Sequence, residues 1–281
     1  MTKAFFLRLV VLTFAVSTVF SVQARQQCSQ SWACVDVKWG VGGKVDFYLR
    51  NNKAYPITMT LEVEPQNLRS GQGNIITKTI AGGTSVLALS YERLNPQKRV
   101  DYDMDYNWAV GSLNVKHDDD YLYRLPYGEV DEHYVVQGFN GGYSHRGFSK
   151  YAVDFAMPDG SKIYAAREGI VVDTEFKNNR GGASRRYARY ANFVVIQHSD
   201  GSTGEYYHLQ QYGVFVRPGD KVERGQLIGS SGSTGFTSLP HLHFAVYKAM
   251  SDGDTQSLPI KFLAQRGVVE NPRSGQRYIA K

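Results

Sequence analysis

Cysteine is scarce in this chain of 281 residues, which contains only Cys28 and Cys34. Two thiolates do not complete a structural zinc site, because such a site needs four ligands and no candidate histidine lies nearby in the sequence. In an oxidising compartment, two cysteines this close together are expected to form a disulfide. The enclosed loop is short, so the bond would hold the N-terminal segment rather than brace the whole fold.

Long apolar stretches are also scarce. Near the N-terminus, Lys3 and Arg8 accompany an apolar run over residues 9–20, and a small-residue pattern suited to cleavage follows at residues 22–24. This arrangement predicts a secretory signal peptide over residues 1–24. The run is short for a membrane span, with an uncleaved anchor as the alternative. No later stretch is apolar enough to cross a bilayer, so we expect an exported protein, periplasmic or secreted, with no stable membrane insertion after cleavage.

No strong run of basic residues interleaved with aromatic residues is present, and such runs are typical of nucleic-acid-binding proteins. We therefore expect no nucleic-acid partner. The formal net charge is +6. A mildly basic exported protein is attracted to anionic wall polymers and to anionic membrane surfaces.

The composition favours β-structure, since 28 glycines and 19 tyrosines suit a turn-rich β protein better than a helical one. In the N-terminal half, apolar and polar residues alternate in short runs separated by Gly, Pro and Asn. Their regular spacing predicts a β-sandwich-like accessory domain over residues 25–125. The predicted strands occupy residues 35–39, 44–49, 58–63, 85–89, 106–110 and 121–123.

The sequence changes character at residues 126–143, which contain Pro126 and several glycines. This composition predicts an irregular linker leading into a second domain over residues 144–281. The second domain is again rich in strand-like runs. The predicted fold class is therefore all-β, with the sandwich followed by an antiparallel β-sheet domain.

The pattern Pro240-His241-Leu242-His243-Phe244 carries the first chemical signal. Side chains alternate along a strand, so His241 and His243 would share one face while Leu242 and Phe244 point into the core. Two imidazoles on one strand face suit a divalent transition metal, because neutral imidazole is a common zinc ligand. His-x-His also occurs on the polar face of ordinary strands.

Two upstream segments supply further candidate ligands. His145 lies in Ser-His-Arg-Gly at residues 144–147, and Asp154 lies in a strand-like run at residues 151–158. A catalytic zinc site takes three protein ligands and a water, and one ligand can be a carboxylate. His145, Asp154 and His243 would form such a set. His208 and His241 would then be free to activate the water or to stabilise an oxyanion.

Taken together, these segments resemble the M23 metallopeptidases, also called the LytM or lysostaphin type. The resemblance covers residues 127–270 and includes Gly-Asp-Lys-Val at residues 219–222 and Gly-Gln-Leu-Ile-Gly at residues 225–229, ahead of Pro-His-Leu-His-Phe. The family's commonest first motif has three residues between His and Asp, whereas eight separate His145 from Asp154. His133 is the rival for the first ligand.

The resemblance implies a LytM-type catalytic sheet that holds one zinc ion per chain through His145, Asp154 and His243, with His208 and His241 in the places of the catalytic histidines. It implies an endopeptidase acting on peptidoglycan stem peptides at their cross-links. Two alternatives remain open. One is a non-catalytic LytM-like regulator of other wall hydrolases, and the other is a secreted zinc protease acting on glycine-rich proteins.

A basic segment over residues 177–191 contains Arg185, Arg186 and Arg189 and no acid. Its glycines predict a mobile loop. Arg pairs with carboxylates through two parallel hydrogen bonds, and stem peptides carry carboxylates. These three arginines are therefore candidates for substrate binding, with a solvated loop that makes no substrate contact as the alternative.

Overall fold

A computed structural model describes residues 25–29 and 31–281. The predicted signal peptide over residues 1–24 therefore lies outside the described residues. Strands dominate the described part, which confirms the all-β class. No helix in it is long and apolar enough to cross a membrane. Its helical elements are short 3₁₀ turns, namely η1 (Val41–Gly43), η2 (Gly147–Ser149), η3 (Arg185–Tyr190) and η4 (Ser251–Gly253).

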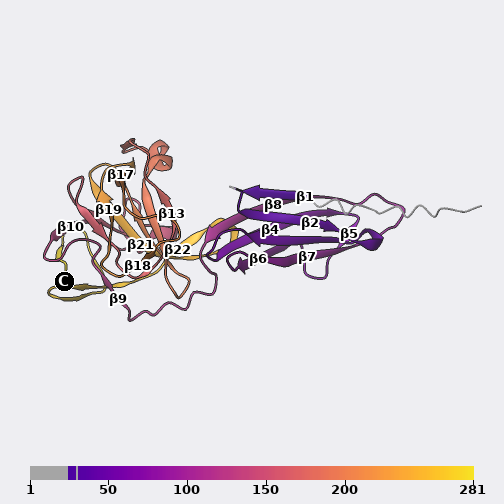
Figure 1. The fold of residues 1–281 in the computed structure, drawn as a ribbon, viewed down its shortest axis with the longest axis horizontal. Helices are drawn as coiled ribbons and strands as arrows, with labels where there is room; N and C mark the ends of the chain where they lie inside the picture. Colours follow the sequence, from indigo (N-terminus) through magenta and orange to yellow (C-terminus); the bar gives the residue numbers. More distant parts are fainter. Residues whose placement is uncertain (1–24, 30) are drawn as a thin grey trace, which may run out of the picture.

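The N-terminal part consists of two sheets that face each other, drawn in indigo and purple in Figure 1. One has the order β1 (Arg25–Ser29), β2 (Ala33–Trp39), β3 (Val45–Asn51), β7 (Ser85–Arg93) and β5 (Leu68–Arg69). The other has the order β6 (Ile75–Ile80), β4 (Ile57–Gln66) and β8 (Asp101–Val110).

Strand alternation builds the core of this sandwich. Phe47 and Leu49 of β3 are fully buried, as are Met59 and Leu61 of β4, and all four belong to one apolar cluster. Burying a side chain of this size stabilises the fold by roughly 1.5–3 kcal/mol. Burial alternates along β3 with the period of two that the sequence shows. In β4 the intervening Thr58 and Thr60 are buried as well, and their hydroxyls form hydrogen bonds with those of Thr79 and Thr77 of β6.

The predicted disulfide is present at the start of the sandwich. Cys28 of β1 lies directly opposite Cys34 of β2, and a disulfide joins them. The bond thus links two adjacent antiparallel strands close to the first described residue.

A large antiparallel sheet forms the centre of the C-terminal part. Its order is β18 (Lys221–Val222), β13 (Gly169–Glu175), β15 (Phe193–Gln197), β16 (Thr203–Tyr207), β21 (His241–Ala249), β11 (Val153–Ala156), β10 (Glu132–Gln137) and β25 (Arg277–Ile279), with β22 (Thr255–Ser257) paired to β21. The antiparallel sheet expected for this part is confirmed.

Smaller sheets complete the C-terminal part. One has the order β12 (Lys162–Tyr164), β19 (Leu227–Ser231) and β17 (Leu209–Val214). Another has the order β24 (Gly267–Val269), β23 (Lys261–Ala264) and β9 (Leu122–Arg124). The strands β14 (Gly181–Gly182) and β20 (Gly235–Phe236) form a short parallel pair.

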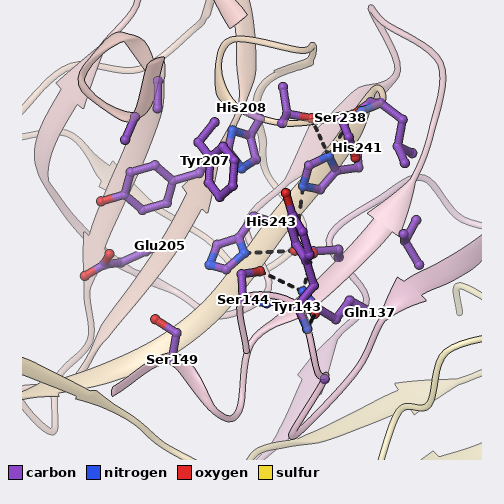
Figure 2. Close-up of a pocket in the computed structure, with 18 of the residues that line it drawn as sticks. Gln137, Tyr143, Ser144, Ser149, Glu205, Tyr207, His208, Ser238, His241 and His243 are labelled. Carbon is purple, nitrogen blue, oxygen red and sulfur yellow. Dashed lines mark hydrogen bonds and ion pairs between the residues drawn. The ribbon is translucent and has the colours of Figure 1, made fainter. Parts of the chain in front are cut away.

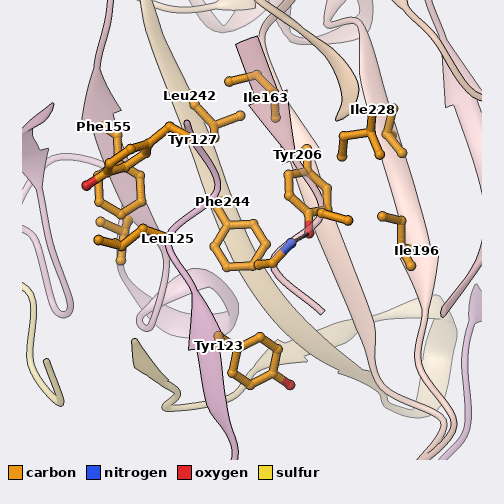
Figure 3. Close-up of a cluster of buried hydrophobic side chains, with 14 of the residues drawn as sticks. Tyr123, Leu125, Tyr127, Phe155, Ile163, Ile196, Tyr206, Ile228, Leu242 and Phe244 are labelled. Atoms are coloured by element: carbon orange, nitrogen blue, oxygen red, sulfur yellow. Dashed lines mark hydrogen bonds between the residues drawn. The ribbon is translucent and has the colours of Figure 1, made fainter. Parts of the chain in front are cut away.

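A second apolar core fills the space between the large sheet and these smaller ones (Figure 3). Phe155, Leu242 and Phe244 enter it from the two central strands β11 and β21. Tyr206 of β16 is fully buried there, and its hydroxyl accepts a hydrogen bond of 2.8 Å from the backbone N–H of Ala166. This core fixes which face of the large sheet is left for a site.

Two expectations for the junction between the parts were wrong. Residues 121–123, expected as a sandwich strand, give β9, which pairs in parallel with β23, and Tyr123 belongs to the C-terminal core. Residues 126–143, expected as an irregular linker, contain β10 of the large sheet. The physical reason is burial: Tyr127 and Val135 are fully buried in the same core, and the glycines between strands form turns rather than a tether.

Candidate functional site

The pairing of β11 with β21 creates the polar face of the site. Asp154 lies directly opposite His243, and Ala156 lies opposite His241. Phe155 and Leu242 are also a facing pair and point into the core. Because side chains alternate, burying the apolar pair places Asp154 and His243 together on the other face. The predicted shared face of His241 and His243 follows from the same register.

Three of the predicted site residues converge within ligand distance. Asp154 Oδ1 lies 2.8 Å from His243 Nδ1 and 3.1 Å from His145 Nε2. The ligand atoms of all three residues lie within 4.8 Å of one another. Eight intervening residues therefore do not keep His145 away from Asp154. His133 lies elsewhere, since its Nδ1 donates to the carbonyl oxygen of Ala156 at 3.1 Å.

The donor set fits a metal ion. The Nδ1–H of His145 donates to the carbonyl oxygen of Gly138 at 2.9 Å. A neutral imidazole has one N–H, so its Nε2 then directs a lone pair at the carboxylate oxygen of Asp154. Two lone pairs face each other stably when a cation lies between them. A second hydrogen bond that fixes the ring and its tautomer is the usual support of a metal-bound histidine.

Gln137 holds this cluster in place, and sequence reasoning missed it. Its Nε2 donates to Asp154 Oδ2 at 3.2 Å and to Ser144 Oγ at 2.7 Å. Its Oε1 accepts from the backbone N–H groups of Tyr143 and Ser144 at 2.9 and 3.1 Å. Gln137 therefore joins the carboxylate to the loop that carries His145. A glycine is required at Gly141, because a Cβ there would lie 2.1 Å from Gln137 Cγ.

An irregularity in β10 explains why Gln137 faces the site. Val135 lies opposite Phe155 and Gln137 lies opposite Asp154, with an extra residue between them. Simple alternation would put Gln137 on the core side with Val135. The bulge changes the phase of the strand, which is a common role of bulges next to functional sites. A buried Gln at the end of a strand, followed by Gly, is the signal that could have identified it.

His208 reaches the site through an unusual backbone. It follows the last residue of β16 and has a φ of +69°, in the left-handed region that non-glycine residues rarely adopt. Strand alternation would send His208 to the face opposite Tyr207. The left-handed turn instead brings both side chains into one groove. The rings of His208 and His241 lie side by side, with centroids 4.6 Å apart.

Both histidines are fixed by carbonyl groups behind them. The Nδ1–H of His208 donates to Thr234 O at 2.7 Å, and that of His241 donates to Leu239 O at 2.8 Å. In a neutral ring this leaves Nε2 free to accept a proton. His241 Nε2 lies 3.7 Å from Asp154 Oδ1, beside the cluster of candidate ligands.

Burial and the neighbouring rings set the ionisation of these groups. Burial, assisted by His241 and His243, lowers the pKa of His208 to about 3. Burial also lowers the pKa of His241. Burial alone would raise the pKa of Asp154, but the interactions with His145 and His243 outweigh it and hold this pKa well below its usual value. At neutral pH the site therefore contains a carboxylate and neutral imidazoles at His208 and His241.

These residues line one groove with a cavity volume of about 810 Å³ (Figure 2). Asp154, His208, His241 and His243 lie along it. The rings of Tyr143 and Phe236, which also line the groove, are 5.9 Å apart. The remaining lining residues include Gln137, Ser144, Ser149, Glu205, Tyr207, Ser238, Leu239, Tyr247 and Thr255. Among the described lining residues, none is Lys or Arg.

The basic segment lies at the rim of this groove. Ala188 and Ala191 contribute to the lining, whereas Arg185, Arg186 and Arg189 are exposed on η3. The guanidinium groups of Arg186 and Arg189 stack on the tyrosines that follow them, at 4.9 Å in each case. Residues 177–191, expected as a loop, contain β14 and η3. Gly181 allows β14 to form, since a Cβ there would lie 1.8 Å from Ser233 O.

Residues 148–257 match the model of peptidase family M23. This part of the chain belongs to that family. The matched segment contains Asp154, His208, His241 and His243, and it begins just after His145. The M23 resemblance stated from the motifs is thereby confirmed.

The relatives of this M23 segment include named peptidases, one of which is a peptidoglycan endopeptidase. The glycyl-glycine endopeptidase ALE-1 of Staphylococcus capitis is 35% identical over 49% of this chain and 33% of its own length. The peptidoglycan DD-endopeptidase ShyA of Vibrio cholerae is 42% identical over 32% of this chain and 18% of its own. The solved catalytic domain of lysostaphin from Staphylococcus simulans is 30% identical over 46% of this chain and 88% of that domain, with a TM-score of 0.32. The chain thus spans between about a fifth and a third of the curated relatives' length.

The first prediction concerns the metal. We expect one divalent ion per chain, and zinc is the ion favoured by two imidazoles and one carboxylate. Replacing His243 with Ala removes a ligand, so elemental analysis of purified protein should show the metal lost from His243→Ala. His133→Ala is the matched control and should keep it. Normal metal content in folded His243→Ala would exclude His243 as a ligand.

Proposed function

We propose that this chain is an exported zinc metallo-endopeptidase that hydrolyses peptide cross-links of bacterial peptidoglycan. The observation that carries the proposal is the convergence of His145, Asp154 and His243, with Asp154 and His243 lining one groove together with His208 and His241. The M23 segment and its relatives support the choice of reaction and substrate. A non-catalytic regulator would be expected to lack one or more of the five residues, and this chain keeps all of them.

We assign the roles of the metal ligands from their chemistry. His145, Asp154 and His243 hold the ion, and Gln137 and the carbonyl of Gly138 keep the carboxylate and the first imidazole in position. Zinc bound there would supply a Lewis acid that activates water and polarises the scissile carbonyl. A substrate would reach the metal ligands from the face of the large sheet that is opposite the apolar core.

His208 and His241 move the proton in this proposal. Each is neutral at pH 7 because burial lowers its pKa, and each directs Nε2 away from the carbonyl that holds its Nδ1–H. One ring accepts the proton of the attacking water at Nε2. Once protonated at Nε2, that ring is a donor that stabilises the oxyanion on the carbonyl and then returns the proton to the nitrogen of the leaving amine as the peptide C–N bond breaks. The pair is close enough, at 4.6 Å between centroids, to serve one reacting group.

Export is part of the proposal. Residues 1–24 have the pattern of a signal peptide, and the disulfide between Cys28 and Cys34 suits an oxidising compartment. Peptidoglycan lies in such a compartment, so the location and the substrate agree with each other.

The proposed reaction predicts a defined product. Purified mature protein loaded with zinc should convert cross-linked muropeptide dimers into monomers, and mass spectrometry should show the gain of one water per bond cut. A chelator should abolish the conversion, and added zinc should restore it. If the protein cleaves a glycine-rich protein but leaves the muropeptide dimers intact, the alternative protease function is favoured and the proposal is contradicted.

Single variants test the two proton-transfer residues. His208→Ala and His241→Ala should each lower kcat by roughly a hundredfold or more while metal content stays normal, because proton transfer and oxyanion stabilisation each contribute effects of that size. Kinetics on a muropeptide dimer, paired with elemental analysis, measures both quantities. A variant that keeps full kcat refutes the role of that residue.

We further propose that the exposed arginines of η3 bind carboxylates of the stem peptides. Replacing Arg185, Arg186 and Arg189 together with Gln should raise KM on wall substrate and flatten the dependence of KM on salt, because exposed charges attract the substrate through a screened interaction. Metal content should not change.

A matched control removes the same charge elsewhere. Arg69, Lys98 and Arg99 are exposed residues of the sandwich, far along the chain from the groove. Their joint replacement with Gln should leave KM and its salt dependence close to those of the wild type. If the two triple variants have the same KM and the same salt dependence of KM, the arginines of η3 are solvated surface groups without a substrate contact.

A further inference from the structure

The groove contains one carboxyl group that the proposed mechanism does not use. Glu205 and Tyr207 of β16 line the groove, and the buried Thr203 lies on the same side of the strand, while Tyr206 points into the core. Glu205 lies opposite the small residue Ala245 of β21, and Glu205 is half-buried. In Figure 2, Glu205 lies below Tyr207, and Glu205 and Ser149 both lie to the left of His243.

Among the residues that the structure describes, no cation pairs with Glu205; the cation nearby, Lys53, acts on Asp173. Its carboxylate accepts a hydrogen bond from Thr203 Oγ1 at 3.2 Å, and the hydroxyl of Tyr207 is a second donor. Asp173 of β13, which β15 separates from β16, also acts on Glu205 and is itself an acid. The second acid of the groove, Asp154, is different, because His145, His243 and Gln137 occupy its oxygens.

The energetics of this carboxyl favour a cationic ligand. Burial, with Asp173 adding to it, raises the pKa of Glu205 to about 7. An ionised carboxylate in such a place has lost much of its hydration and has no internal counter-ion, which is costly. A cation entering the groove would remove that cost. The candidate metal ligands His145, Asp154 and His243 do not include Glu205.

We propose that Glu205 is a specificity-determining subsite that binds a primary ammonium group of the peptide substrate. A primary ammonium has three N–H donors. The carboxylate of Glu205 is one acceptor, and the hydroxyl-bearing residues Tyr207 and Ser149 line the same groove. This inference rests on the proposed function, which places a peptide in the groove. Lysine-like diamino residues of a peptide would supply the group.

The register locates the subsite relative to the reaction. Glu205 lies opposite Ala245, two positions along β21 from His243. Two strand residues span about 6–7 Å, which is also the span of two residues of an extended peptide. The ammonium group should therefore belong to a residue within about two positions of the scissile bond.

The test compares two substrates that differ in one amine. A cross-linked muropeptide dimer with its free amine intact is paired with the same dimer after acetylation of that amine. The wild type should cleave the amine form with a kcat/KM about tenfold or more higher, as a charge-assisted hydrogen bond is worth at least that much. Glu205→Gln should reduce this ratio to near one, by raising KM for the amine form alone.

Two controls separate binding from folding. Glu223→Gln removes an exposed acid outside the groove and should keep the wild-type ratio. Metal content and melting temperature of Glu205→Gln should match the wild type. A merely structural role for Glu205 would lower kcat/KM for both dimers equally and leave the ratio unchanged, which would overturn the proposal.

The proposed function and the subsite fail in different ways. One outcome is that the wild type and Glu205→Gln cleave the two dimers with the same ratio of kcat/KM for the amine form to kcat/KM for the acetylated form. In that case the subsite is wrong and the endopeptidase function stands. If wild type with zinc cleaves neither dimer, the proposed function is wrong. Equilibrium binding of the two dimers to wild type and Glu205→Gln then decides the subsite: equal affinity for both dimers in the wild type overturns it, and an amine preference that Glu205→Gln loses supports it.

Discussion

The site depends on the register between β11 and β21. Phe155 and Leu242 are buried as a facing pair, and this fixes Asp154 against His243 on the opposite face. A slip of one residue would turn every side chain of one strand to the other face and would put a carboxylate into an apolar core. The metal-ligand geometry is therefore held by hydrophobic burial on the reverse side of the sheet, before any ion contributes to it.

The parts of the site that follow strand periodicity could be predicted from the sequence, and the parts that break it could not. His241 and His243 share a face because β21 alternates regularly. His208 faces the groove because its backbone is left-handed, and Gln137 faces Asp154 because β10 has an extra residue. Both features depend on tertiary contacts. For His208, the order of motifs in a known family supplied what periodicity could not.

The junction between the two parts shows a related limit. Glycine and proline at residues 126–143 correctly indicate turns, but turns inside a sheet and turns in a linker have the same local composition. What distinguishes them is the burial of Tyr127 and Val135, which depends on strands more than a hundred residues later in the chain, such as β25. The N-terminal sandwich carried enough regular alternation for its two sheets to be expected from sequence.

The two apolar cores are not independent. Val172 of β13 and Val195 of β15 belong to the large sheet, yet both are buried in the same cluster as the sandwich residues Tyr55 and Ile57. Gln197 of β15 also donates to the carbonyl oxygen of Pro56 at 3.5 Å. The accessory part is thus seated on two strands that lead, through β16, to Glu205 and Tyr207. A displacement of the sandwich would be transmitted to the floor of the groove through these hydrogen-bonded strands, so the position of the N-terminal part and the shape of the groove are mechanically connected.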